Sequence, residues 1–537
     1  MSVFNEFPYT NLHELNLDWL IGKVKETEKK IDDFILDTDD KIIDQVNTWL
    51  DEHPEATTTV QDGALTLPKF AESLKLLTVK DYVTPEMFGG VGDGVTDDSD
   101  AVQAAINDGR PVVLLGKTYV LNRQILLRSD LVIKGLENAM LKWNAYTTDT
   151  WHIGGMTLDN ICIKDVNFDF GPQTSLQNSI SILNSNKIAL INCNVTGGYG
   201  YAVRLNHSTD ILIDHCIFSN ITGAETNPGG AIYGLDMNSV VVSNCIFNDL
   251  DDHGVYIAGR DGAYNMHVNN NSFRNNGRSG LTNGAAIVLY ANCYDIEISG
   301  NIMINCKTGI YGGLYSSYTG VNTNINVINN IIKGCRENGI TFFGTDTAYC
   351  EGINIIGSVI DGTTQDAITL RKCGHCNISK NIIRRTTRHG IALSNSIENI
   401  IDSNIIRQCS GNGIYIGWPD PATFNMITNN IMTTSGTYTG QYGLYIRESD
   451  YNRAFNNWAN GFSEQSALGG THIVNAYSEP WAFQKAIYWT DNISRAQYHN
   501  VGDIVILTTP TAGSPMMYVC TEAGNPGTLK VLATVSA

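Results

Sequence analysis

The densest group of acidic side chains lies in the segment NDLDDHGVYI, residues 248–257. Hydrolysis of a glycosidic bond uses two carboxyl groups about 5–9.5 Å apart, one as proton donor and one as base or nucleophile. Asp251 and Asp252 are therefore candidates for acid and base, and His253 and Asp236 are candidates for assisting them. The alternative interpretation is a polar turn in which the aspartates cap backbone amides.

Tyrosines form the second group of candidate residues. Tyr256, Tyr311, Tyr415 and Tyr445 occupy the same place in short apolar segments that follow a glycine. Rigid aromatic rings suit stacking on the C–H faces of sugars, because they bury apolar area at little entropic cost. We expect these rings to bind substrate, and packing under loops or between subunits is the alternative. The same role is expected for residues that follow two of them, namely Trp418, Glu448 and Asp450.

A third cluster of titratable residues recurs at one repeat position. Its equivalents in other repeats are amides, which favours a structural corner ladder over catalysis. The spacing Cys373-Gly-His-Cys376 is typical of zinc ligands, but no second pair accompanies it, so neither a metal nor a cofactor is expected. The cluster comprises Asp366 and His389 with Glu337 and Arg388 beside them, and the equivalents are Asn338 and Asn412.

Composition and charge exclude several classes of partner. The 537 residues carry a formal net charge of −19, with a pI of about 4.9. An acidic surface repels phosphate backbones and anionic lipids, so we expect neither nucleic acid binding nor membrane insertion. A neutral glycan, or an anionic polymer bound through local Arg and Lys, is compatible with this charge. Only 17% of residues are charged, which argues against disorder.

A repeat between about 110 and 460 is the strongest signal in the sequence. Each unit contains a short segment in which apolar and polar residues alternate. A doublet of two residues follows, and then two further apolar residues, as in ISKNII (378–383) and IDSNII (401–406). Successive units are 23–30 residues apart, and their fourth residue is mostly Asn or Cys. That column contains Val166, Cys193, Cys216, Cys245, Asn271, Asn301, Asn330, Ser358, Asn381, Asn404, Asn430 and Asn457.

This period, with two or three short strands per unit and glycine at the corners, predicts an all-β fold: a single-stranded parallel β-helix of about twelve rungs. Stacked amides about 4.8 Å apart hydrogen-bond along a ladder. Leucine-rich repeats and propellers have other spacings. Most of the 12 cysteines share columns, so we expect buried free thiols and assembly in a reducing cytoplasm.

The two ends of the chain differ from the repeat. Residues 1–53 are expected to form a helical segment with an imperfect heptad seam, and residues 54–82 a polar connector. Residues 83–110 contain glycine turns and a helix at 101–107 that covers the open end of the β-helix at 111–462. Residues 463–537 predict a small all-β domain. The heptad rows contain Leu17, Val24 and Ile31, and Ile21, Ile35, Ile42 and Trp49.

The N-terminal segment MSVFNEFPYTNLHELN has neither a basic region nor an apolar core, so no signal peptide is expected. No run approaches the ~20 apolar residues of a membrane span. A protein that acts at a cell surface without a signal peptide is released by lysis, which favours a component of a virion.

Three segments resemble phage proteins. PEMFGGVGDGVTDDSDAVQAAI (85–106) resembles the start of the pectate-lyase-superfamily β-helix in tailspikes. FPYTNLHELNLDWLIGKVKE (7–26) is similar to virion-anchoring segments of tail and appendage proteins. The segment 502–530 resembles their closing domain, with Tyr518 and Leu529 where tryptophans are common.

The resemblance implies a right-handed β-helix, a homotrimer closed by the C-terminal domain, and attachment to virion or tail proteins through residues 1–53. It also implies binding of a bacterial surface polysaccharide such as capsule, exopolysaccharide or teichoic acid. Two functional classes remain open: a depolymerase, either hydrolase or lyase, and a non-catalytic adhesin or structural appendage of the same fold.

Overall fold

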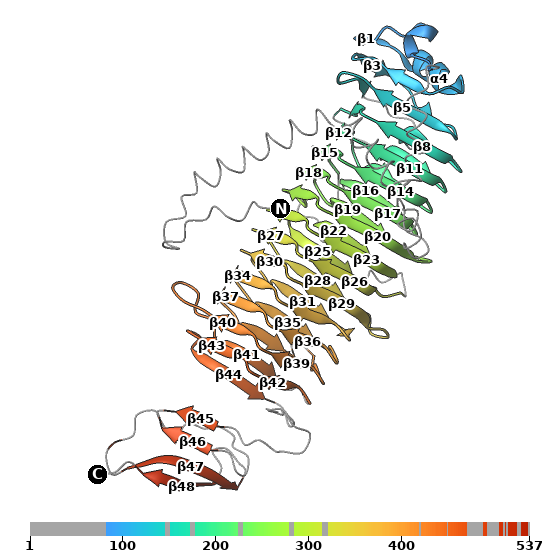
Figure 1. The fold of residues 1–537 in the computed structure, drawn as a ribbon. Helices are drawn as coiled ribbons and strands as arrows, with labels where there is room; N and C mark the ends of the chain where they lie inside the picture. Colours follow the sequence, from blue (N-terminus) through green and yellow to red (C-terminus); the bar gives the residue numbers. More distant parts are fainter. Residues whose placement is uncertain are drawn as a thin grey trace, which may run out of the picture. The chain divides into compact units, whose positions relative to one another are not determined.

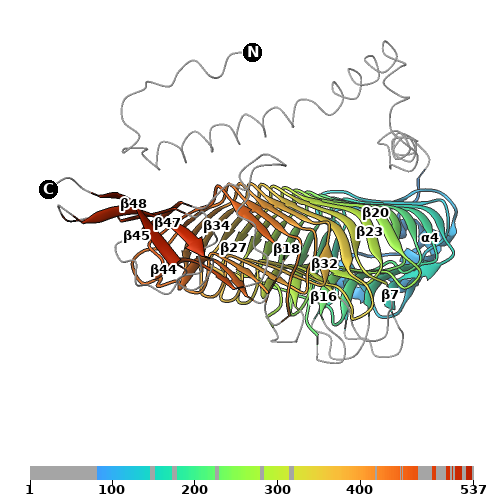
Figure 2. The same cartoon turned by 90° about the horizontal axis from the view of Figure 1, so that it is seen from below.

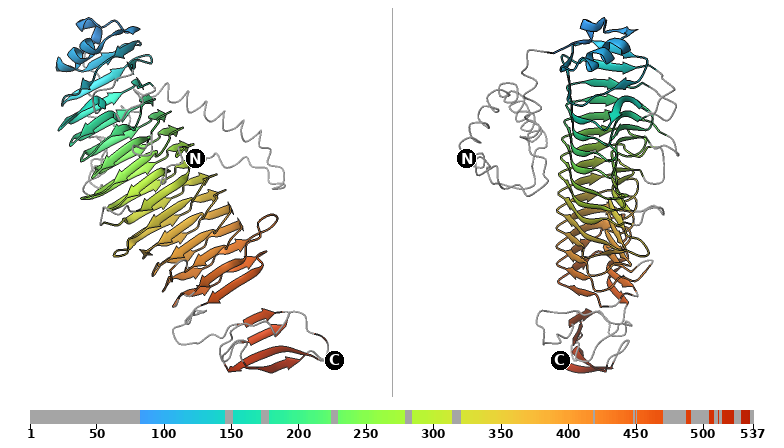
Figure 3. Two further views of the ribbon diagram at one scale, coloured as in Figure 1. Left: turned by 180° about the vertical axis from the view of Figure 1, so that it is seen from behind. Right: turned by 90° about the vertical axis from the view of Figure 1, so that its right-hand side faces the viewer.

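The computed structural model describes residues 82–144, 151–171, 178–223, 229–278, 284–313, 320–417, 420–447, 449, 451–469, 487–490, 504–507, 511, 514–522 and 528–534. Residues 82–469 form a rod in which short strands stack across the long axis (Figures 1 and 3). The strands belong to three parallel sheets, which we call A, B and C in the order in which the chain visits them within one turn.

Sheet A contains β2 (Val112–Leu114), β5 (Leu131–Gly135), β8 (Asp159–Lys164), β11 (Asn186–Ile191), β14 (Thr209–Asp214), β17 (Asn238–Ser243), β20 (Ala263–Asn269), β23 (Cys293–Ser299), β26 (Thr323–Ile328), β29 (Cys350–Ile356), β32 (Cys373–Gly374), β33 (Asn377–Ser379), β36 (Ile400–Asp402), β39 (Met426–Thr428) and β42 (Arg453–Phe455).

Sheet B contains β1 (Asp93–Asp97), β3 (Thr118–Leu121), β6 (Met140–Trp143), β9 (Asn167–Asp169), β12 (Asn194–Thr196), β15 (Ile217–Ser219), β18 (Ile246–Asn248), β21 (Ser272–Arg274), β24 (Ile302–Ile304), β27 (Ile331–Lys333), β30 (Val359–Asp361), β34 (Ile382–Thr386), β37 (Ile405–Cys409), β40 (Ile431–Thr433) and β43 (Trp458–Asn460).

Sheet C contains β4 (Ile125–Leu126), β7 (Trp151–Met156), β10 (Asn178–Leu183), β13 (Tyr201–Arg204), β16 (Gly230–Leu235), β19 (Val255–Ala258), β22 (Ala285–Tyr290), β25 (Thr308–Gly313), β28 (Ile340–Phe343), β31 (Ile368–Arg371), β35 (Ile391–Ser394), β38 (Ile414–Ile416), β41 (Tyr442–Arg447) and β44 (Glu464–Gly469). Figure 2 shows β20 and β23 of sheet A on one side of the rod and β7 and β16 of sheet C on the other.

The predicted parallel β-helix is confirmed, with all twelve ladder-bearing rungs, and two further rungs built from β2 to β7 precede them. Inward residues of successive strands pair in register, for example Ile340 with Ile368 and Ile368 with Ile391. These side chains are buried in one continuous apolar core along the rod. Alternation with period two therefore places every second residue of a strand in the core.

A buried amide ladder fixes the corner between sheets A and B. In each of the twelve rungs this corner has two residues, of which the first has positive φ and the second points inward. The backbone N–H and the Nδ2 of Asn381 both donate to Oδ1 of Asn404 at 3.0 Å. Asn404 donates in the same way to Asn430 at 2.9 Å, and its Nδ2 also reaches the carbonyl of Ile378 at 2.8 Å. Every polar atom of the ladder amide is thereby satisfied.

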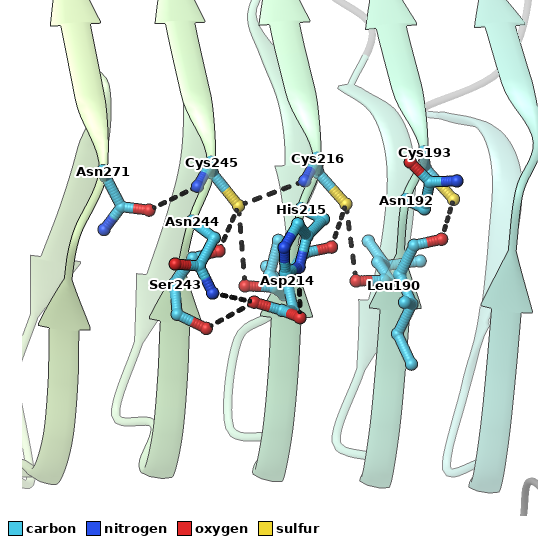
Figure 4. A network of polar contacts seen from close by, with 12 residues as sticks. Leu190, Asn192, Cys193, Asp214, His215, Cys216, Ser243, Asn244, Cys245 and Asn271 are labelled. Carbon is cyan, nitrogen blue, oxygen red and sulfur yellow. Dashed lines mark hydrogen bonds and ion pairs between the residues drawn. The ribbon is translucent and has the colours of Figure 1, made fainter. Parts of the chain in front are cut away.

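Cysteines continue this ladder in earlier rungs (Figure 4). The backbone N–H of Cys245 donates to Oδ1 of Asn271 at 2.8 Å, and the N–H of Cys216 donates to the sulfur of Cys245 at 3.4 Å. The thiol of Cys216 donates to the carbonyl of Leu190 at 3.4 Å. All 12 cysteines are free and buried, as the sequence predicted. Burial raises the pKa of the Cys193 thiol well above its usual value, which keeps it protonated.

The N-terminal end of the rod is covered by the 3-10 helix η3 (Pro85–Phe88) and the helix α4 (Ser99–Asn107). Helix α4 buries Val102, Ala105 and Ile106 against the first rungs, where the sequence predicted a helix at 101–107. At the other end, β44 pairs with β41, so the β-helix extends beyond the predicted boundary at 462 to Gly469. The predicted boundary was wrong because the repeat was recognised by its ladder residues, and β44 lies after the last of these, Asn457.

The C-terminal region contains a separate four-stranded sheet in the order β45 (Ile487–Thr490), β46 (Ile504–Leu507), β47 (Pro515–Glu522) and β48 (Thr528–Thr534). The pairs β46–β47 and β47–β48 are antiparallel. No helix among the described residues is long and apolar enough to cross a membrane. The predicted helical segment 1–53 and the connector up to residue 81 lie outside the described residues.

The amide ladder predicts a large effect of one buried substitution. Asn404→Ala removes four hydrogen bonds and leaves buried donors and acceptors without partners, so we expect a loss of about 2–4 kcal/mol in the free energy of unfolding. Urea denaturation followed by circular dichroism measures it. The control is Arg407→Ala, which changes an exposed side chain on the following strand and should cost less than about 0.5 kcal/mol. Equal effects of both substitutions would contradict the structural role of the ladder.

Candidate functional site

The outer face of sheet C carries the predicted column of outward residues. The register is confirmed from rung to rung, with Tyr256 opposite Val288, and Tyr415 opposite Tyr445. These tyrosines are less exposed than the sequence suggested, since Tyr415 is only 9% exposed and the others are half-buried. The column runs through Tyr256, Val288, Tyr311, Thr341, Thr369, Ala392, Tyr415 and Tyr445.

Burial of the rings results from stacking along the rod. The ring centroids of Tyr201 and Tyr233 are 4.7 Å apart, those of Tyr233 and Tyr256 are 5.2 Å apart, and those of Tyr256 and Tyr290 are 5.8 Å apart. Tyr311 packs against the same apolar cluster. Aromatic pairs at such distances stabilise one another, so this part of sheet C is a rigid apolar platform.

Asp252 and His253 lie beside this platform, at the corner that leads from β18 to β19. The Asp252 carboxyl is 3% exposed, and its Oδ2 lies 3.0 Å from Nε2 of His253. Nδ1 of His253 accepts the backbone N–H of Ala285 at 3.3 Å, so the proton of the neutral ring is on Nε2 and is donated to Asp252. The imidazole ring also packs on Tyr256, with a centroid distance of 5.0 Å.

Burial shifts the pKa values of Asp252 and His253 in the directions that favour their neutral forms. Desolvation raises the pKa of Asp252 to about 7, against a smaller opposing effect of Lys307, and Asp251 raises it further. Desolvation lowers the pKa of His253 to about 3, and Lys307 lowers it further. Oδ1 of Asp252 is buried and has no hydrogen-bond partner among the described residues. Near neutral pH this carboxyl therefore exists partly as the acid, with a proton available at Oδ1.

Two residues of later rungs complete the surroundings of Asp252. Gly284 packs close to the buried Oδ1, since a side chain there would place its Cβ 3.0 Å from that oxygen. The ammonium group of Lys307 lies 3.7 Å from a carboxylate oxygen of Glu337. Lys307 is also close enough to Asp252 to favour the ionised form of its carboxyl, although burial outweighs this effect.

Asp251 differs from its neighbour in exposure and partners. Its Oδ1 lies 3.0 Å from the guanidinium of Arg278, and its Oδ2 accepts the backbone N–H of Gly223 at 3.2 Å. The side chain is 21% exposed. The two aspartates therefore provide one paired carboxylate and one buried carboxyl at the same corner.

The expected proximity of Asp236 is wrong. Asp236 follows β16 at the corner between sheets C and A, where its Oδ1 accepts the N–H groups of Arg260, Asp261 and Gly262. Leu235 pairs with Ala258, six residues beyond Asp252, so Asp236 and Asp252 lie at opposite ends of sheet C, roughly 20 Å apart. Both residues flank a strand of the same sheet, but at its two different ends, and Asp236 acts as a cap for a turn.

A cavity of about 180 Å³ opens farther along the same face, where the third cluster of the sequence lies. Asp366 is fully buried there and accepts bonds from the guanidinium of Arg388, the hydroxyl of Thr369 and the N–H of His389. The expectation of a structural corner is consistent with these bonds. Desolvation lowers the pKa of His389 to about 4, so the ring is neutral.

The remaining candidates are only partly described. Tyr415 and Tyr445 stack with their centroids 5.2 Å apart. Trp418, Glu448 and Asp450 lie outside the described residues.

Two residues near the Asp252 corner, Tyr233 and Lys307, were not among those predicted from the sequence. Tyr233 lies in AIYGL (231–235), whose pattern matches the other sheet C strands, so extending the column by one rung would have found it. Lys307 gives no signal of its own, because its approach to Asp252 depends on the stacking of separate rungs.

The buried pair has opposite effects on the pH dependence of stability. Between about pH 4 and 7 Asp252 keeps a proton that the unfolded chain releases, so its contribution to the unfolding free energy falls as pH rises. Between about pH 3 and 6.5 neutral His253 lacks a proton that the unfolded chain binds, so its contribution rises with pH. The two slopes, each up to about 1.4 kcal/mol per pH unit, oppose one another in the wild-type protein.

Asp252→Asn removes one of these slopes. We expect the unfolding free energy of the variant minus that of the wild type to increase by about 1 kcal/mol per pH unit between about pH 4.5 and 6.5. Urea unfolding at several pH values measures this difference. The control is Asp249→Asn, which changes a half-exposed residue at the start of the same corner. The difference between its unfolding free energy and that of the wild type should not change with pH. A constant difference for Asp252→Asn would show that the carboxyl is not protonated in the fold.

Two family models match the chain. One, described as "Right handed beta helix region", matches residues 178–360, in agreement with the expected hand of the β-helix. The other, described as "Periplasmic copper-binding protein (NosD)", matches residues 343–475. Among the described residues no group of three or more His, Cys, Asp or Glu side chains is arranged to hold a metal ion.

Curated relatives come from phages. The chain is 26% identical over 340 residues to a capsule K30/K69-specific depolymerase of Klebsiella phage K64-1, covering 54% of this chain and 43% of the relative. It is 24% identical over 330 residues to the pre-neck appendage protein of Bacillus phage B103, covering 53% and 35%. The chain thus spans less than half the length of these relatives.

Solved structures share the fold. A tailspike protein mutant of E. coli bacteriophage HK620, in complex with a pentasaccharide, superposes with a TM-score of 0.58 at 14% identity, covering 86% of this chain and 93% of the tailspike. At this identity the likeness concerns the fold. The chain is therefore a right-handed parallel β-helix protein similar to phage depolymerases, tailspikes and appendage proteins.

Proposed function

We propose that this chain is a phage tailspike or tail appendage that binds a bacterial surface polysaccharide on the outer face of sheet C and cleaves it. The names of the relatives support a virion component that engages glycans, and one of them is a capsule-specific depolymerase. The stacked tyrosines support glycan binding, since a rigid platform of rings loses little entropy when a sugar packs on it.

The observation that carries the catalytic part is the burial of the Asp252 carboxyl beside His253, whose ring packs on Tyr256. A general acid for glycosidic cleavage must hold a proton near neutral pH, and burial raises the pKa of Asp252 to about 7. His253 holds Oδ2 by donating its Nε2 proton, which leaves Oδ1 to carry the transferable proton. Asp251, paired with Arg278, is the candidate base. As the glycosidic bond breaks, the proton moves from Oδ1 to the leaving-group oxygen, and Asp251 takes a proton from the water molecule that bonds to the anomeric carbon.

A non-catalytic adhesin of the same fold is the second candidate. Asp236 and Asp251 accept hydrogen bonds from backbone amides, as expected for aspartates that cap turns, and Asp252 is 3% exposed. In that case the tyrosines alone bind the glycan, and the aspartates only stabilise corners.

Replacement of the proposed acid separates the two functions. Asp252→Asn preserves size and shape but cannot donate the proton, so we expect the release of new reducing ends from purified capsular and exopolysaccharides to fall on the order of a hundredfold, with binding retained. Asp249→Asn is the matched control and should keep full activity. Full activity of Asp252→Asn places the chemistry elsewhere, and absence of cleavage by the wild type favours the adhesin.

Attachment and assembly belong to the same proposal. Residues 1–53 carry a heptad pattern and resemble virion-anchoring segments, so we assign them to contacts with virion or tail proteins and to parallel association of three chains. Lysis releases such a particle from the host cytoplasm, an environment compatible with the 12 free thiols.

Sheet B offers a surface for the homotrimer. From β15 to β43 its strands begin with an outward apolar residue that pairs in register from rung to rung, interrupted only by Ser272. The stripe spans roughly 45 Å at about 4.8 Å per rung, and a parallel copy of the same rod matches it in length and spacing. Its exposed or half-buried members are Ile217, Ile246, Ile302, Ile331, Val359, Ile382, Ile405, Ile431 and Trp458.

Light scattering tests this assembly. At micromolar concentration we expect a mass of three chains of 58.8 kDa, and Ile382→Asp should weaken association because it buries a charge in the interface. Ile400→Asp is a matched control, since Ile400 is 39% exposed against 38% for Ile382 but lies on sheet A. A monomeric wild-type mass, or equal effects of the two substitutions, would contradict this interface.

A further inference from the structure

The cavity on sheet C lies several rungs away from the Asp252 corner and plays no part in the chemistry proposed there. It is lined by residues of β28, β31, β35 and β38 and of the corners that precede them. Its volume of about 180 Å³ is below the ~300 Å³ at which sites for drug-sized ligands begin, so it suits one sugar residue. The lining residues are Asn338, Phe343, Gln365, Thr369, Arg371, Arg388, His389, Ala392, Ser394 and Tyr415.

The shape of the cavity follows from the outward column of sheet C. Thr341, Thr369 and Ala392 occupy three adjacent rungs between Tyr311 and Tyr415, and the small side chains of Thr369 and Ala392 leave space for the cavity above them. Tyr415 on the next rung and Phe343 on an earlier rung form its aromatic ends. The Tyr415 ring is fixed by His389 and Tyr445, at centroid distances of 4.6 and 5.2 Å.

The carboxylates near the cavity are already engaged. Asp366 receives two bonds from the guanidinium of Arg388 and two more from Thr369 and His389, which satisfies its four acceptor sites. Asp420 pairs with Arg371 at 3.3 Å, and both of these side chains are 43% exposed. Neither carboxylate is among the lining residues.

Hydrogen-bond donors, in contrast, remain available. The Arg388 side chain is 52% exposed although one edge of its guanidinium binds Asp366. Nε of Arg371 is buried and has no acceptor among the described residues. Nδ1 of His389 accepts the N–H of Asn412 at 2.9 Å, so the ring keeps its proton on Nε2. The cavity therefore presents two cations and a neutral N–H donor on a protein whose net charge is −19.

We propose that this cavity is a subsite for one sugar residue that carries an anionic group, with Arg371 and Arg388 contacting the anion and Tyr415 the sugar ring. The inference rests on the proposed glycan-binding function and adds the charge of the ligand. Guanidinium groups bind carboxylate and phosphate oxygens with directed hydrogen bonds. The anion is a uronate or another carboxylate of the glycan, or a phosphodiester of a teichoic acid, which share this chemistry.

The position of the cavity sets its role. Asp366 occupies the same sheet C position as His253, four rungs farther along, which corresponds to roughly 19 Å. A polymer lying along the rod contacts both places through different residues. The subsite therefore contributes to affinity for the polymer and not to the proton transfer at Asp252.

Binding to defined polymers tests the inference. The probes are hyaluronan, polygalacturonate, their carboxyl-reduced neutral forms, and poly(glycerol phosphate), and isothermal titration calorimetry measures affinity. We expect the wild type to bind at least one anionic probe tenfold or more tightly than a neutral form. Preference for a uronate or for poly(glycerol phosphate) identifies the source of the anion. Equal affinity for a uronate polymer and its carboxyl-reduced form, with no stronger binding of the phosphate polymer, overturns the inference but leaves glycan binding intact. Binding to none of the probes argues against both.

One substitution assigns the effect to the cavity. Arg371→Gln removes a partly exposed cation and should weaken binding of the anionic probe about tenfold, without changing affinity for neutral probes or the thermal melting curve. Arg407→Gln, an outward arginine on sheet B, is the matched control and should have no effect. Arg388 is not replaced in this test because its loss would leave the buried Asp366 carboxylate without its paired cation. Undiminished anion binding by Arg371→Gln would overturn the assignment.

Discussion

The hydrogen bonds between ladder residues at the corner of sheets A and B determine the register of the rungs that carry them. Each ladder amide accepts two bonds from the preceding rung and donates to the following one, so a rung displaced by one residue would leave buried polar atoms without partners on both sides. Burial of apolar side chains drives folding, but it is nearly indifferent to which isoleucine faces which. The ladder supplies the directional preference that apolar packing lacks, and the column on sheet C is straight because this corner is fixed.

This corner also explains which parts of the fold could be read from the sequence. The spacing of Asn381, Asn404 and Asn430 is visible because the structure allows few substitutions for an inward amide at a two-residue corner. The two rungs formed by β2 to β7 have no such residue and were not counted. The last strand of the rod, β44, was not predicted for a related reason. It completes a rung whose ladder residue, Asn457, had already been assigned, and it has no ladder residue of its own.

The candidate site was less predictable, for physical reasons that differ between residues. Asp251, Asp252 and His253 are adjacent in the chain, and their occurrence in one corner was expected. Asp236 was misplaced because a repeat pattern gives the rung of a residue and the sheet it flanks, but not which end of the strand brings it close to a partner. The burial of Asp252 depends on Gly284 and on rings from neighbouring rungs, and no local pattern encodes it.

The corners of one rung evolve under unequal constraints. The corner between sheets A and B has two residues in every ladder-bearing rung, whereas the segments before and after sheet C vary, which produces the 23–30-residue spacing of the repeat. Lengthening a surface connection is inexpensive, at about 0.6 kcal/mol for each doubling of its length. Insertions and deletions therefore accumulate at the two edges of the proposed binding face without disturbing the rod. Under the proposed function, exchange of these edges would change the glycan that is recognised while the scaffold stays the same.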